Sequence, residues 1–270
     1  METVIARAAA FGYDGLEWRG GLDGHVSPAL PPEARQRLRR WVAEAGLASL
    51  AVTAYSRFTS AEASERAVQL DHLRRHLDLA ADLGAQFVRT FVGQLPPGRT
   101  AAEALPAICE SLSLAAKHAA SRGVIVAVET HDEYVHSTAI AQIVSQVGHP
   151  ALRALWDFGN AFAAGEDPAE GLRVLGPYLG YVHVKDGMLQ GAAWRLTRLS
   201  EGQVPLAATV RGLLAAGYRG GLCVEWERAW HPELDPAETA LPAALAAVRR
   251  WLAEAEIALA GAGPQEQTQP

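Results

Sequence analysis

Four short apolar stretches of the sequence lead into acidic residues or a histidine, at residues 126–131, 155–160, 181–186 and 222–227. Successive side chains of a β-strand point to opposite faces, so one alternate set can be assigned to covering helices and the other to an interior. The first set is apolar throughout: Val126, Val128, Trp156, Phe158, Val182, Val184, Val224 and Trp226. The second set carries the charge: Glu129, His131, Asp157, His183, Lys185, Glu225 and Glu227. Because unpaired buried charge is costly, the second set predicts a metal site spread over four strands.

An ordinary network of buried ion pairs is the alternative to a metal site. Lys185 is the only lysine or arginine in the inward set, and one ammonium group cannot neutralise the carboxylates around it. A bound cation is therefore the favoured interpretation of these residues.

Short β segments alternate with helical segments rich in Ala, Leu and Arg, which indicates βα units around a parallel sheet. We expect strands near 15–19, 48–53, 86–92, 124–130, 153–158, 180–185 and 221–226. We expect helices near 2–11, 32–45, 62–83, 101–122, 137–147, 168–175, 204–216 and 236–258. The 270 residues and 49% hydrophobic content suit one α/β barrel domain, over residues 1–258. The tail at 259–270 contains Gln, Gly and Pro and is expected to be disordered.

The number of strands is one short of a (β/α)8 TIM-type barrel. A strand should precede the first helix, and the chain begins inside that helix, so the expected fold is a (β/α)8 barrel that lacks its first β-strand in this chain. Either the barrel is open beside its last strand, or the recorded start lies downstream of the true one. We favour the second, because an open parallel sheet exposes unpaired edges beside the site.

Recognisable motifs follow one another along the chain: FGYDGLE at 11–17, LGA at 83–85, VETH at 128–131, DFGN at 157–160, HVKD at 183–186 and GYRGG at 217–221. Each motif is weak alone, but together they resemble the sugar phosphate isomerase/epimerase family, the xylose isomerase-like barrels, over residues 2 to about 255. In that family four strand-end residues bind one divalent cation. The resemblance implies Glu129, Asp157, His183 and Glu225 as the ligands, in agreement with the alternation.

Three carboxylates and one imidazole form a hard site suited to Mn²⁺, Mg²⁺ or Co²⁺, with Zn²⁺ as a further option. Such a cation can bind two adjacent oxygens of a hydroxy-carbonyl substrate and stabilise the enediolate that forms when the neighbouring C–H loses its proton. Glu129 and Glu225 are the predicted catalytic pair. One carboxylate removes a proton and the other returns it, which gives isomerisation or epimerisation beside a carbonyl.

Substrate contacts are predicted for the residues around this site: Glu17, Arg89, His131, Asn160, Lys185 and Arg198. Many sugar epimerases of the family have histidine three residues after the metal-binding aspartate, where this chain has Asn160, whose amide does not titrate near neutral pH. Arg198 belongs to a segment at 187–204 that is long enough for a lid, where it either meets a phosphate or carboxylate or is solvated. A structural salt bridge is the alternative for Lys185, and a place at the barrel rim is the alternative for Arg89.

The leading function is that of a metal-dependent isomerase or epimerase of a small sugar, sugar acid or related hydroxy-carbonyl compound. An inosose or keto-acid dehydratase on the same scaffold is the main alternative, since only a leaving hydroxyl differs. An enzyme like the apurinic endonucleases would need more histidines and a DNA-binding groove, which the net charge of −6 disfavours. The intact ligand set argues against a non-catalytic sugar-binding barrel.

Compartment and partners follow from what the sequence lacks. Cys109 and Cys223 have no CxxC or zinc-finger spacing, the first residues show neither a basic n-region nor an apolar h-region, and no apolar run approaches membrane-spanning length. We therefore expect a cytoplasmic protein with a small sugar-like substrate and neither nucleic acid nor membrane as partner. Homo-oligomerisation, the identity of the metal, and the presence of a phosphate on the substrate stay open.

Overall fold

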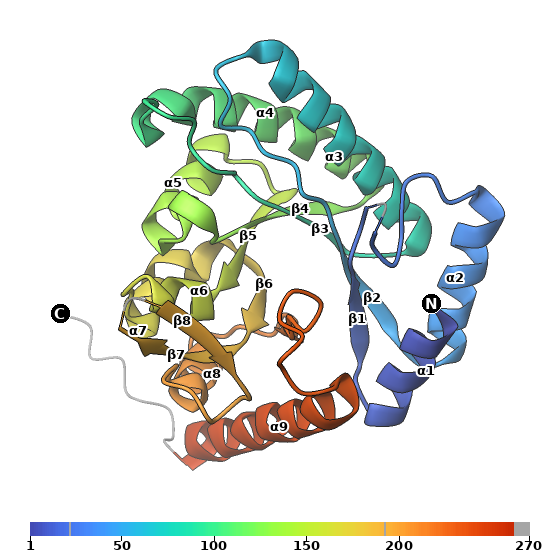
Figure 1. Cartoon of the computed structure of the whole chain (residues 1–270), viewed down its shortest axis with the longest axis vertical. Coiled ribbons are helices and arrows are strands. Elements are labelled where there is room, and N and C mark those ends of the chain that lie inside the picture. The colour runs from blue at the N-terminus through green and yellow to red at the C-terminus, as the bar shows by residue number, and fades with distance from the viewer. Residues whose placement is uncertain (22, 192, 262–270) are drawn as a thin grey trace.

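Seven parallel strands form a nearly closed barrel in the computed structural model, which describes residues 1–21, 23–191 and 193–261. The strands are β1 (Gly15–Trp18), β2 (Ala48–Thr53), β3 (Phe87–Thr90), β4 (Ile125–Glu129), β5 (Leu152–Asp157), β6 (Leu179–Val184) and β9 (Leu222–Val224). They pair in the order β1-β2-β3-β4-β5-β6-β9, with every neighbouring pair parallel. Helices lie outside the strands (Figure 1). The expected α/β barrel of seven strands is confirmed.

The helices of the described residues are α1 (Glu2–Phe11), α2 (Pro32–Glu44), α3 (Ala63–Leu83), α4 (Ala101–Arg122), α5 (Ser137–Val147), α6 (Phe158–Ala163), α7 (Pro168–Leu175), α8 (Leu206–Ala215) and α9 (Ala237–Gly261). All but α6 were predicted, with boundaries within three residues. Helix α9 continues to Gly261, so residues 259–261 are helical and the predicted disordered tail is wrong for them. The rest of that tail, 262–270, lies outside the described residues.

A short helix and a hairpin beside the site were not predicted. Helix α6 begins directly after β5, because the Asp157 carboxylate accepts a hydrogen bond from the Asn160 backbone N–H at 2.9 Å and caps the helix. Strands β7 (Asp186–Gln190) and β8 (Ala193–Thr197) form an antiparallel hairpin in the segment expected to be a loop. The hairpin is tied to the turn that follows it by the Asp186 carboxylate, which accepts hydrogen bonds from backbone N–H groups of Gly187, Ser200, Gly202 and Val204.

The alternation along the strands separates two apolar layers. Most of the residues assigned to the helix-covered face are fully buried in the larger, outer core: Val126, Val128, Trp156, Phe158, Val182 and Val184. A smaller core fills the barrel interior: Ala51, Phe87, Ala127, Leu155 and Tyr181. The assignment of Trp226 to the outer core is wrong. It lies beyond the end of β9, where strand alternation no longer applies, and its indole N–H donates to the Asp235 carbonyl at 2.9 Å.

The barrel has one open side, between β1 and β9. Within the described ranges no backbone pairing joins these two strands. Leu16, Leu222 and Val224 from the two end strands are only partly buried against the outer core. Side chains cross the open side instead, and at its mouth the Arg19 guanidinium lies over the Trp230 ring, 5.3 Å from the centroid.

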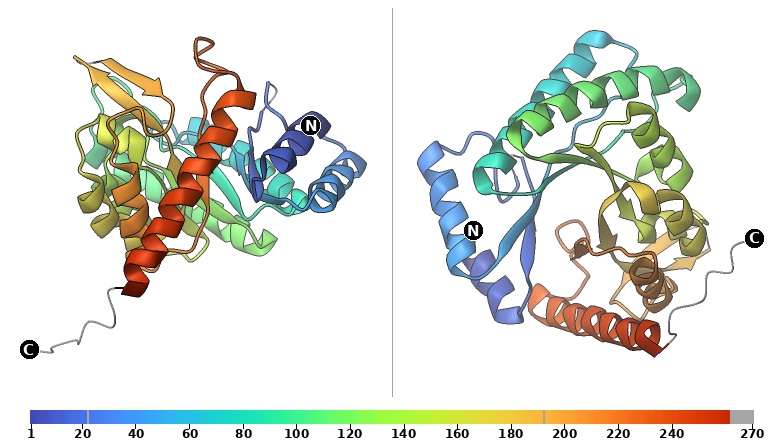
Figure 2. Two further views of the ribbon diagram at one scale, coloured as in Figure 1. Left: turned by 90° about the horizontal axis from the view of Figure 1, so that it is seen from below. Right: turned by 180° about the vertical axis from the view of Figure 1, so that it is seen from behind.

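The hairpin and the segment after β9 project from the same end of the barrel, as Figure 2 shows. Both follow the carboxyl ends of strands, which is the end where TIM barrels place their functional groups. This end is therefore where the predicted site should lie. No helix among the described residues is both long enough and apolar enough to cross a bilayer.

Candidate metal centre

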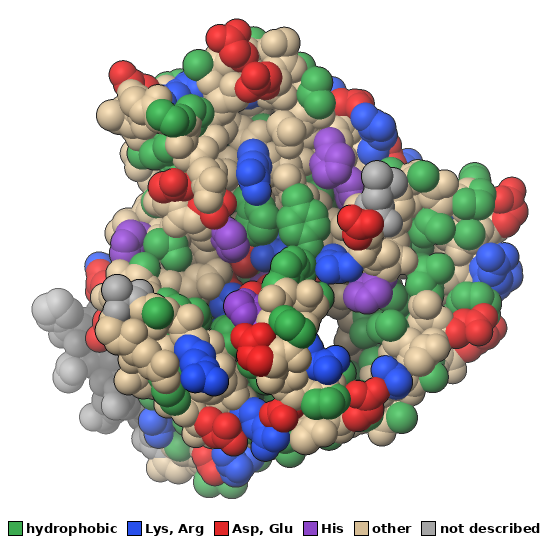
Figure 3. All heavy atoms as spheres, viewed as in Figure 1, with side chains coloured by type: hydrophobic (Ala, Val, Ile, Leu, Met, Phe, Trp, Pro, Cys, Tyr) green, Lys and Arg blue, Asp and Glu red, His purple; other side chains and the backbone are tan. Residues whose placement is uncertain are grey.

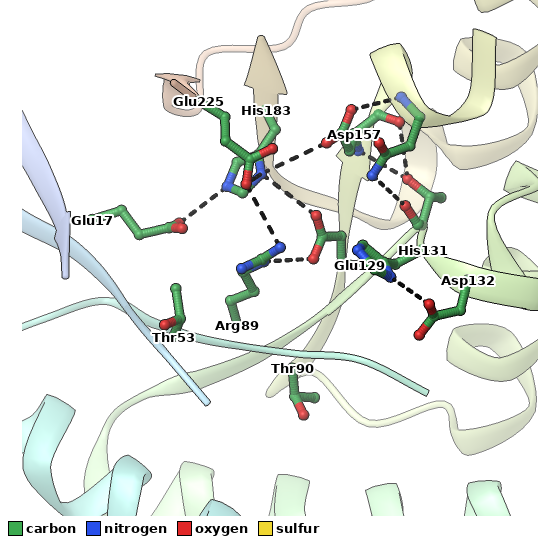
Figure 4. A network of polar contacts seen from close by, with 12 residues as sticks. Glu17, Thr53, Arg89, Thr90, Glu129, His131, Asp132, Asp157, His183 and Glu225 are labelled. Atoms are coloured by element: carbon green, nitrogen blue, oxygen red, sulfur yellow. Dashed lines mark hydrogen bonds and ion pairs between the residues drawn. The ribbon is translucent and has the colours of Figure 1, made fainter. Parts of the chain in front are cut away.

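The four predicted ligands converge at the carboxyl ends of four strands. Glu129 and Asp157 are the last residues of β4 and β5, His183 is in β6, and Glu225 follows β9 directly. Parallel pairing brings them together, because Asp157 is in register with His183 and the neighbouring strands end at the same edge of the barrel. Figure 4 shows their side chains pointing toward a common centre. On the space-filling face in Figure 3, histidine and charged side chains gather around a central hollow.

Distances within this group suit a single cation. One ligand atom from each of the four residues lies within 4.8 Å of the others. His183 Nδ1 is 3.6 Å from a Glu129 oxygen, 3.5 Å from a Glu225 oxygen and 4.0 Å from an Asp157 oxygen. A cation about 2.0–2.6 Å from each ligand separates opposite ligands by about 4–5 Å, so these spacings leave room for one ion.

Unsatisfied buried atoms provide a second test of fit. Glu129 Oε1 and His183 Nδ1 have no hydrogen bond among the described residues, although both side chains are almost completely buried, and Asp157 Oδ2 is met only by the Lys185 ammonium, at 2.8 Å. Buried polar atoms normally have a hydrogen-bond partner, so two unpartnered atoms that face the same point favour a further partner there. Three carboxylates and one imidazole nitrogen form a donor set that divalent Mn, Mg or Co accepts. The residues present therefore fit a divalent cation.

Two basic side chains also enter the group. Lys185 Nζ lies 2.8 Å from carboxylate oxygens of Asp157, Glu225 and Glu227. Arg89 donates through Nε to the Glu129 carboxylate, and its Nη2 is 3.7 Å from Glu225 Oε1. The expectation that Lys185 is the only cation near these carboxylates is wrong, because Arg89 reaches them from β3. An ion-pair network is thus present, and it coexists with the unsatisfied ligand atoms.

Burial and these charges shift the pKa values of Asp157 and Glu129, two of the predicted ligands, in opposite directions. Burial raises the pKa of Asp157 from 3.8 to about 6, and the Lys185 ammonium offsets only part of that effect. Burial also disfavours the ionised form of Glu129, but the charges of Arg89 and His183 outweigh it and lower the pKa of Glu129 to about 2. Glu129 is therefore held ionised by its neighbours near neutral pH, whereas Asp157 depends more on a compensating cation.

For His183, the histidine among the four predicted ligands, neighbouring carboxylates raise the pKa. Burial disfavours the imidazolium, yet the carboxylates of Glu17 and Glu225 hold the pKa of His183 well above its usual range. These carboxylates therefore favour the imidazolium form of His183. A divalent cation at the centre would replace the Nδ1 proton, because a ligating histidine nitrogen must be deprotonated.

The other predicted substrate contacts lie at different distances from this centre. Glu17, Arg89 and Lys185 contact the ligands directly. The His131 ring stacks on Phe91, with centroids 4.3 Å apart, and its Nδ1 is 3.1 Å from the Asp132 carboxylate.

Asn160 and Arg198 are held by protein partners in this structure. The Asn160 side-chain amide is 3.4 Å from the Thr130 carbonyl oxygen, close to Asp157. The Arg198 guanidinium pairs with Asp235 and lines a surface pocket between the hairpin and the segment after β9, together with Trp226. The four-ligand group does not include Arg198. Contact of these residues with a substrate stays a prediction.

Tyr181 is a residue of this site that the sequence reasoning did not select. Its hydroxyl donates to Glu17 at 2.6 Å, and its ring belongs to the inner core. Tyr181 has the same strand parity as His183, two residues later, and this parity was the signal that could have identified it. Glu227 was assigned to the inward set but to no role, and it completes the contacts of Lys185.

Sequence comparison identifies the family. The chain belongs to the xylose isomerase-like TIM barrels, whose family pattern matches residues 5–254. The resemblance inferred from the motifs is thereby confirmed.

Individual relatives catalyse more than one reaction. The chain is 30% identical over 192 residues to 2-epi-5-epi-valiolone 7-phosphate 2-epimerase of Actinoplanes sp., a match that covers 68% of this chain and 67% of that protein. It is 24% identical over 238 residues to 3-dehydroshikimate dehydratase of Pseudomonas putida, with 83% of this chain matched but only 36% of the length of that protein. The structure of an L-ribulose 3-epimerase superposes with a TM-score of 0.82 at 18% identity, over 100% of this chain and 93% of the other, which shows a shared fold.

Proposed function

We propose that this protein is a divalent-metal-dependent epimerase or isomerase of a small sugar or related hydroxy-carbonyl compound. The observation that carries the proposal is the convergence of ligand atoms from Glu129, Asp157, His183 and Glu225 at one end of the barrel, where buried Glu129 Oε1 and His183 Nδ1 have no hydrogen bond among the described residues. Membership of the family and the epimerase among the relatives support the same class of reaction.

Four residues would hold the cation: Glu129, Asp157, His183 and Glu225. When bound, a divalent cation supplies electrophilic stabilisation of negative charge on substrate oxygen, which makes the C–H beside a carbonyl more acidic. Mn²⁺, Mg²⁺ and Co²⁺ match the donor set best, and Zn²⁺ is also compatible with it.

Glu129 and Glu225 are proposed to exchange the proton. They occupy different environments, because the Glu225 side chain is 20% exposed whereas the Glu129 side chain is completely buried. Glu225 can therefore meet a substrate that enters from the barrel mouth. Glu129 has one oxygen held by Arg89, and the other faces the centre. Removal of a proton on one side and its return on the other requires two such groups on opposite sides of the substrate carbon.

The surrounding residues are suited to bind hydroxyl groups. Proposed contacts are His131, Asn160, Lys185 and Arg89, with Glu17 and Arg198 at the edges of the site. The proposed partner is a small sugar-like molecule, and neither nucleic acid nor membrane has a role in this proposal. Association of copies of the chain is compatible with it.

A dehydratase is the second candidate, and the relative in Pseudomonas putida favours it. Both reactions begin with removal of a proton beside a carbonyl, and a dehydratase then expels a hydroxyl group from the adjacent carbon. A nuclease is a weaker candidate. The net charge is −6, and the described residues contain two groups that could hold metal, which share His183.

The decisive experiment is a screen of ketoses, hydroxypyruvate and inososes in D₂O, with Mn²⁺ and with chelator, followed by proton NMR. An epimerase or isomerase introduces solvent deuterium at one carbon and keeps all hydroxyl groups. A dehydratase gives a product with one oxygen fewer. Turnover that is indifferent to chelator would contradict the proposed metal dependence.

A further inference from the structure

Glu17 links the open side of the barrel to the metal centre. It belongs to β1, at one end of the strand order, and its carboxylate oxygen Oε2 lies 3.2 Å from His183 Nε2 on β6. The same oxygen accepts a hydrogen bond from the Tyr181 hydroxyl at 2.6 Å. Only β9 and the open side separate β6 from β1 in that direction, so these contacts cross the interior where no strand closes the barrel. Figure 4 shows Glu17 reaching His183 from the side opposite Glu129 and Asp157.

The two nitrogens of His183 face different partners. Nε2 is directed at Glu17, and Nδ1 is directed at oxygens of Glu129, Asp157 and Glu225 at 3.5–4.0 Å. In a neutral imidazole one nitrogen carries the hydrogen and the other carries the lone pair. A carboxylate can only accept a hydrogen bond, so the hydrogen belongs on Nε2 and the lone pair on Nδ1, toward the cation position.

The His183 ring is only 1% exposed, so it has little room to rotate and exchange the positions of its two nitrogens. Glu17 is itself restrained, since its side chain is 11% exposed and the buried Tyr181 hydroxyl contacts it. Carboxylates that accept the second N–H of a ligating histidine commonly fix its tautomer and increase its affinity for metal.

We propose that Glu17 is the positioning residue of the metal centre, which presents His183 Nδ1 to the cation, with the Tyr181 hydroxyl holding Glu17 in place. This inference rests on the proposed metal site. It gives Glu17 a function besides the substrate contact predicted from the sequence, and it makes the end strand β1 part of the centre.

A competing arrangement must be distinguished. Glu17, His183 and Cys223 also lie close enough together to hold a cation of their own. That arrangement would use His183 Nε2 as a ligand, the nitrogen that faces Glu17 in the present structure. The two arrangements therefore differ in which nitrogen binds the metal, and NMR can measure this.

The experiment compares wild type with Glu17→Leu, Glu17→Gln and Tyr181→Phe, using Glu44→Gln on the exposed surface of α2 as the matched control. Mn²⁺ affinity is measured by titration calorimetry, and circular dichroism and thermal unfolding report the fold. The His183 tautomer is read from ¹⁵N–¹H correlation spectra of the Zn²⁺-loaded proteins. These readouts do not depend on activity.

We expect wild-type His183 to bind Zn²⁺ through Nδ1. Glu17→Leu should weaken Mn²⁺ binding about 10- to 100-fold, the usual range for loss of such a partner. Glu17→Gln should recover most of that loss, because its amide oxygen still accepts the Nε2 hydrogen. Tyr181→Phe should give a smaller loss, and the control variant none.

Unchanged Mn²⁺ affinity in a folded Glu17→Leu protein would overturn the inference, as would zinc on Nε2. A second zinc equivalent that disappears in Cys223→Ser would overturn it in favour of the competing arrangement. If Glu17→Leu does not fold, the Glu17→Gln and Tyr181→Phe affinities decide the question. Should wild type bind no divalent cation, the proposed function itself fails, whereas wild-type binding with unaffected variants rejects only the role of Glu17.

Discussion

Lys185 Nζ lies 2.8 Å from Asp157 Oδ2, the oxygen that also faces the predicted cation position. In the proposed metal centre, the ammonium group and a divalent cation would therefore act on the same carboxylate. Because Lys185 also contacts Glu225 and Glu227, it supplies part of the positive charge that a metal-free centre needs. The ammonium group therefore stabilises these carboxylates, and it would repel a cation that binds beside it.

Lys185→Met should lower the stability of the metal-free protein and raise its affinity for Mn²⁺. The metal-free protein should lose about 3–5 kcal/mol of stability, because buried carboxylates lose a partner. Affinity for Mn²⁺ should rise, by about tenfold for each 1.4 kcal/mol of repulsion removed. Chemical unfolding and titration calorimetry measure the two effects. Lys117→Met is the matched control at an exposed position on α4, where both quantities should stay unchanged.

Mn²⁺ should stabilise the wild-type protein against unfolding. At one hundred times the dissociation constant, a ligand that binds only the folded state adds about 2.7 kcal/mol. Thermal unfolding with Mn²⁺ and with excess chelator should show this difference, and His183→Ala should abolish it. An unfolding midpoint that is indifferent to all divalent ions tested would contradict the proposed metal centre.

Glu225→Gln should lose turnover while it keeps the fold. An amide can still offer an oxygen to the metal but cannot exchange a proton, and general acid–base groups contribute about 10²–10⁴-fold to rate. The fold should tolerate the change, because Lys185 keeps Asp157 and Glu227 as partners. Steady-state kinetics on the substrate found in the screen provides the measurement. Near-normal turnover would exclude Glu225 as an acid or base.

Glu129→Gln should differ from Glu225→Gln in its effect on stability. Glu129 is completely buried and accepts a hydrogen bond from the buried Arg89 guanidinium, so loss of its charge leaves a cation poorly compensated. We expect a loss of about 3–5 kcal/mol in unfolding free energy. Adding Arg89→Met to Glu129→Gln should restore part of the lost stability, since the second change removes the uncompensated charge. Equal stability of the two single glutamine variants would contradict this difference in environment.

Acid should destabilise the protein through His76 on α3. Burial lowers the pKa of His76 from 6.5 to about 4, and the side chain is only 1% exposed. In the unfolded chain His76 therefore binds a proton below about pH 6.5, whereas in the folded protein it binds one only below about pH 4. The stabilisation is complete above pH 6.5 and is lost as the pH falls through this window, with about 2 kcal/mol lost between pH 7 and pH 5.

Urea unfolding at pH 7 and pH 5 measures the effect of His76. In His76→Gln the decrease between the two pH values should be smaller than in wild type, whatever the stability of the variant at pH 7. His231→Gln, at an exposed position, should retain the wild-type decrease. The same decrease in both variants would show that other groups account for the pH dependence.

Much of the fold follows from local sequence. Alternating β segments and helical segments, with glycine at helix ends such as Gly84 and Gly123, predicted eight helices and seven strands, all of which are present. Strand parity placed Glu129, Asp157 and His183 on the inner face, because alternation is a property of each strand by itself. It was wrong for Trp226, where the strand had already ended.

Other features depend on contacts between distant parts of the chain. The β7–β8 hairpin is held by Asp186 through backbone groups up to 18 residues away, which local patterns do not reveal. Arg89 reaches Glu129 across neighbouring strands, so the charge balance of the site could not be counted along one strand. The order of strands and the register between them decide such pairs.

The sequence by itself determined the βα repeat, the inner and outer faces of the strands, and the residue types available to bind a cation, because each of these depends on local alternation and composition. Only the tertiary structure decided which charges meet. Lys185 and Arg89 are partners of the predicted ligands, and Glu17 faces His183 from a strand 166 residues earlier, because the curvature of a nearly closed barrel brings β1 close to β6, with only β9 and the open side between them. That curvature comes from the pairing of all seven strands together and cannot be read from any single segment.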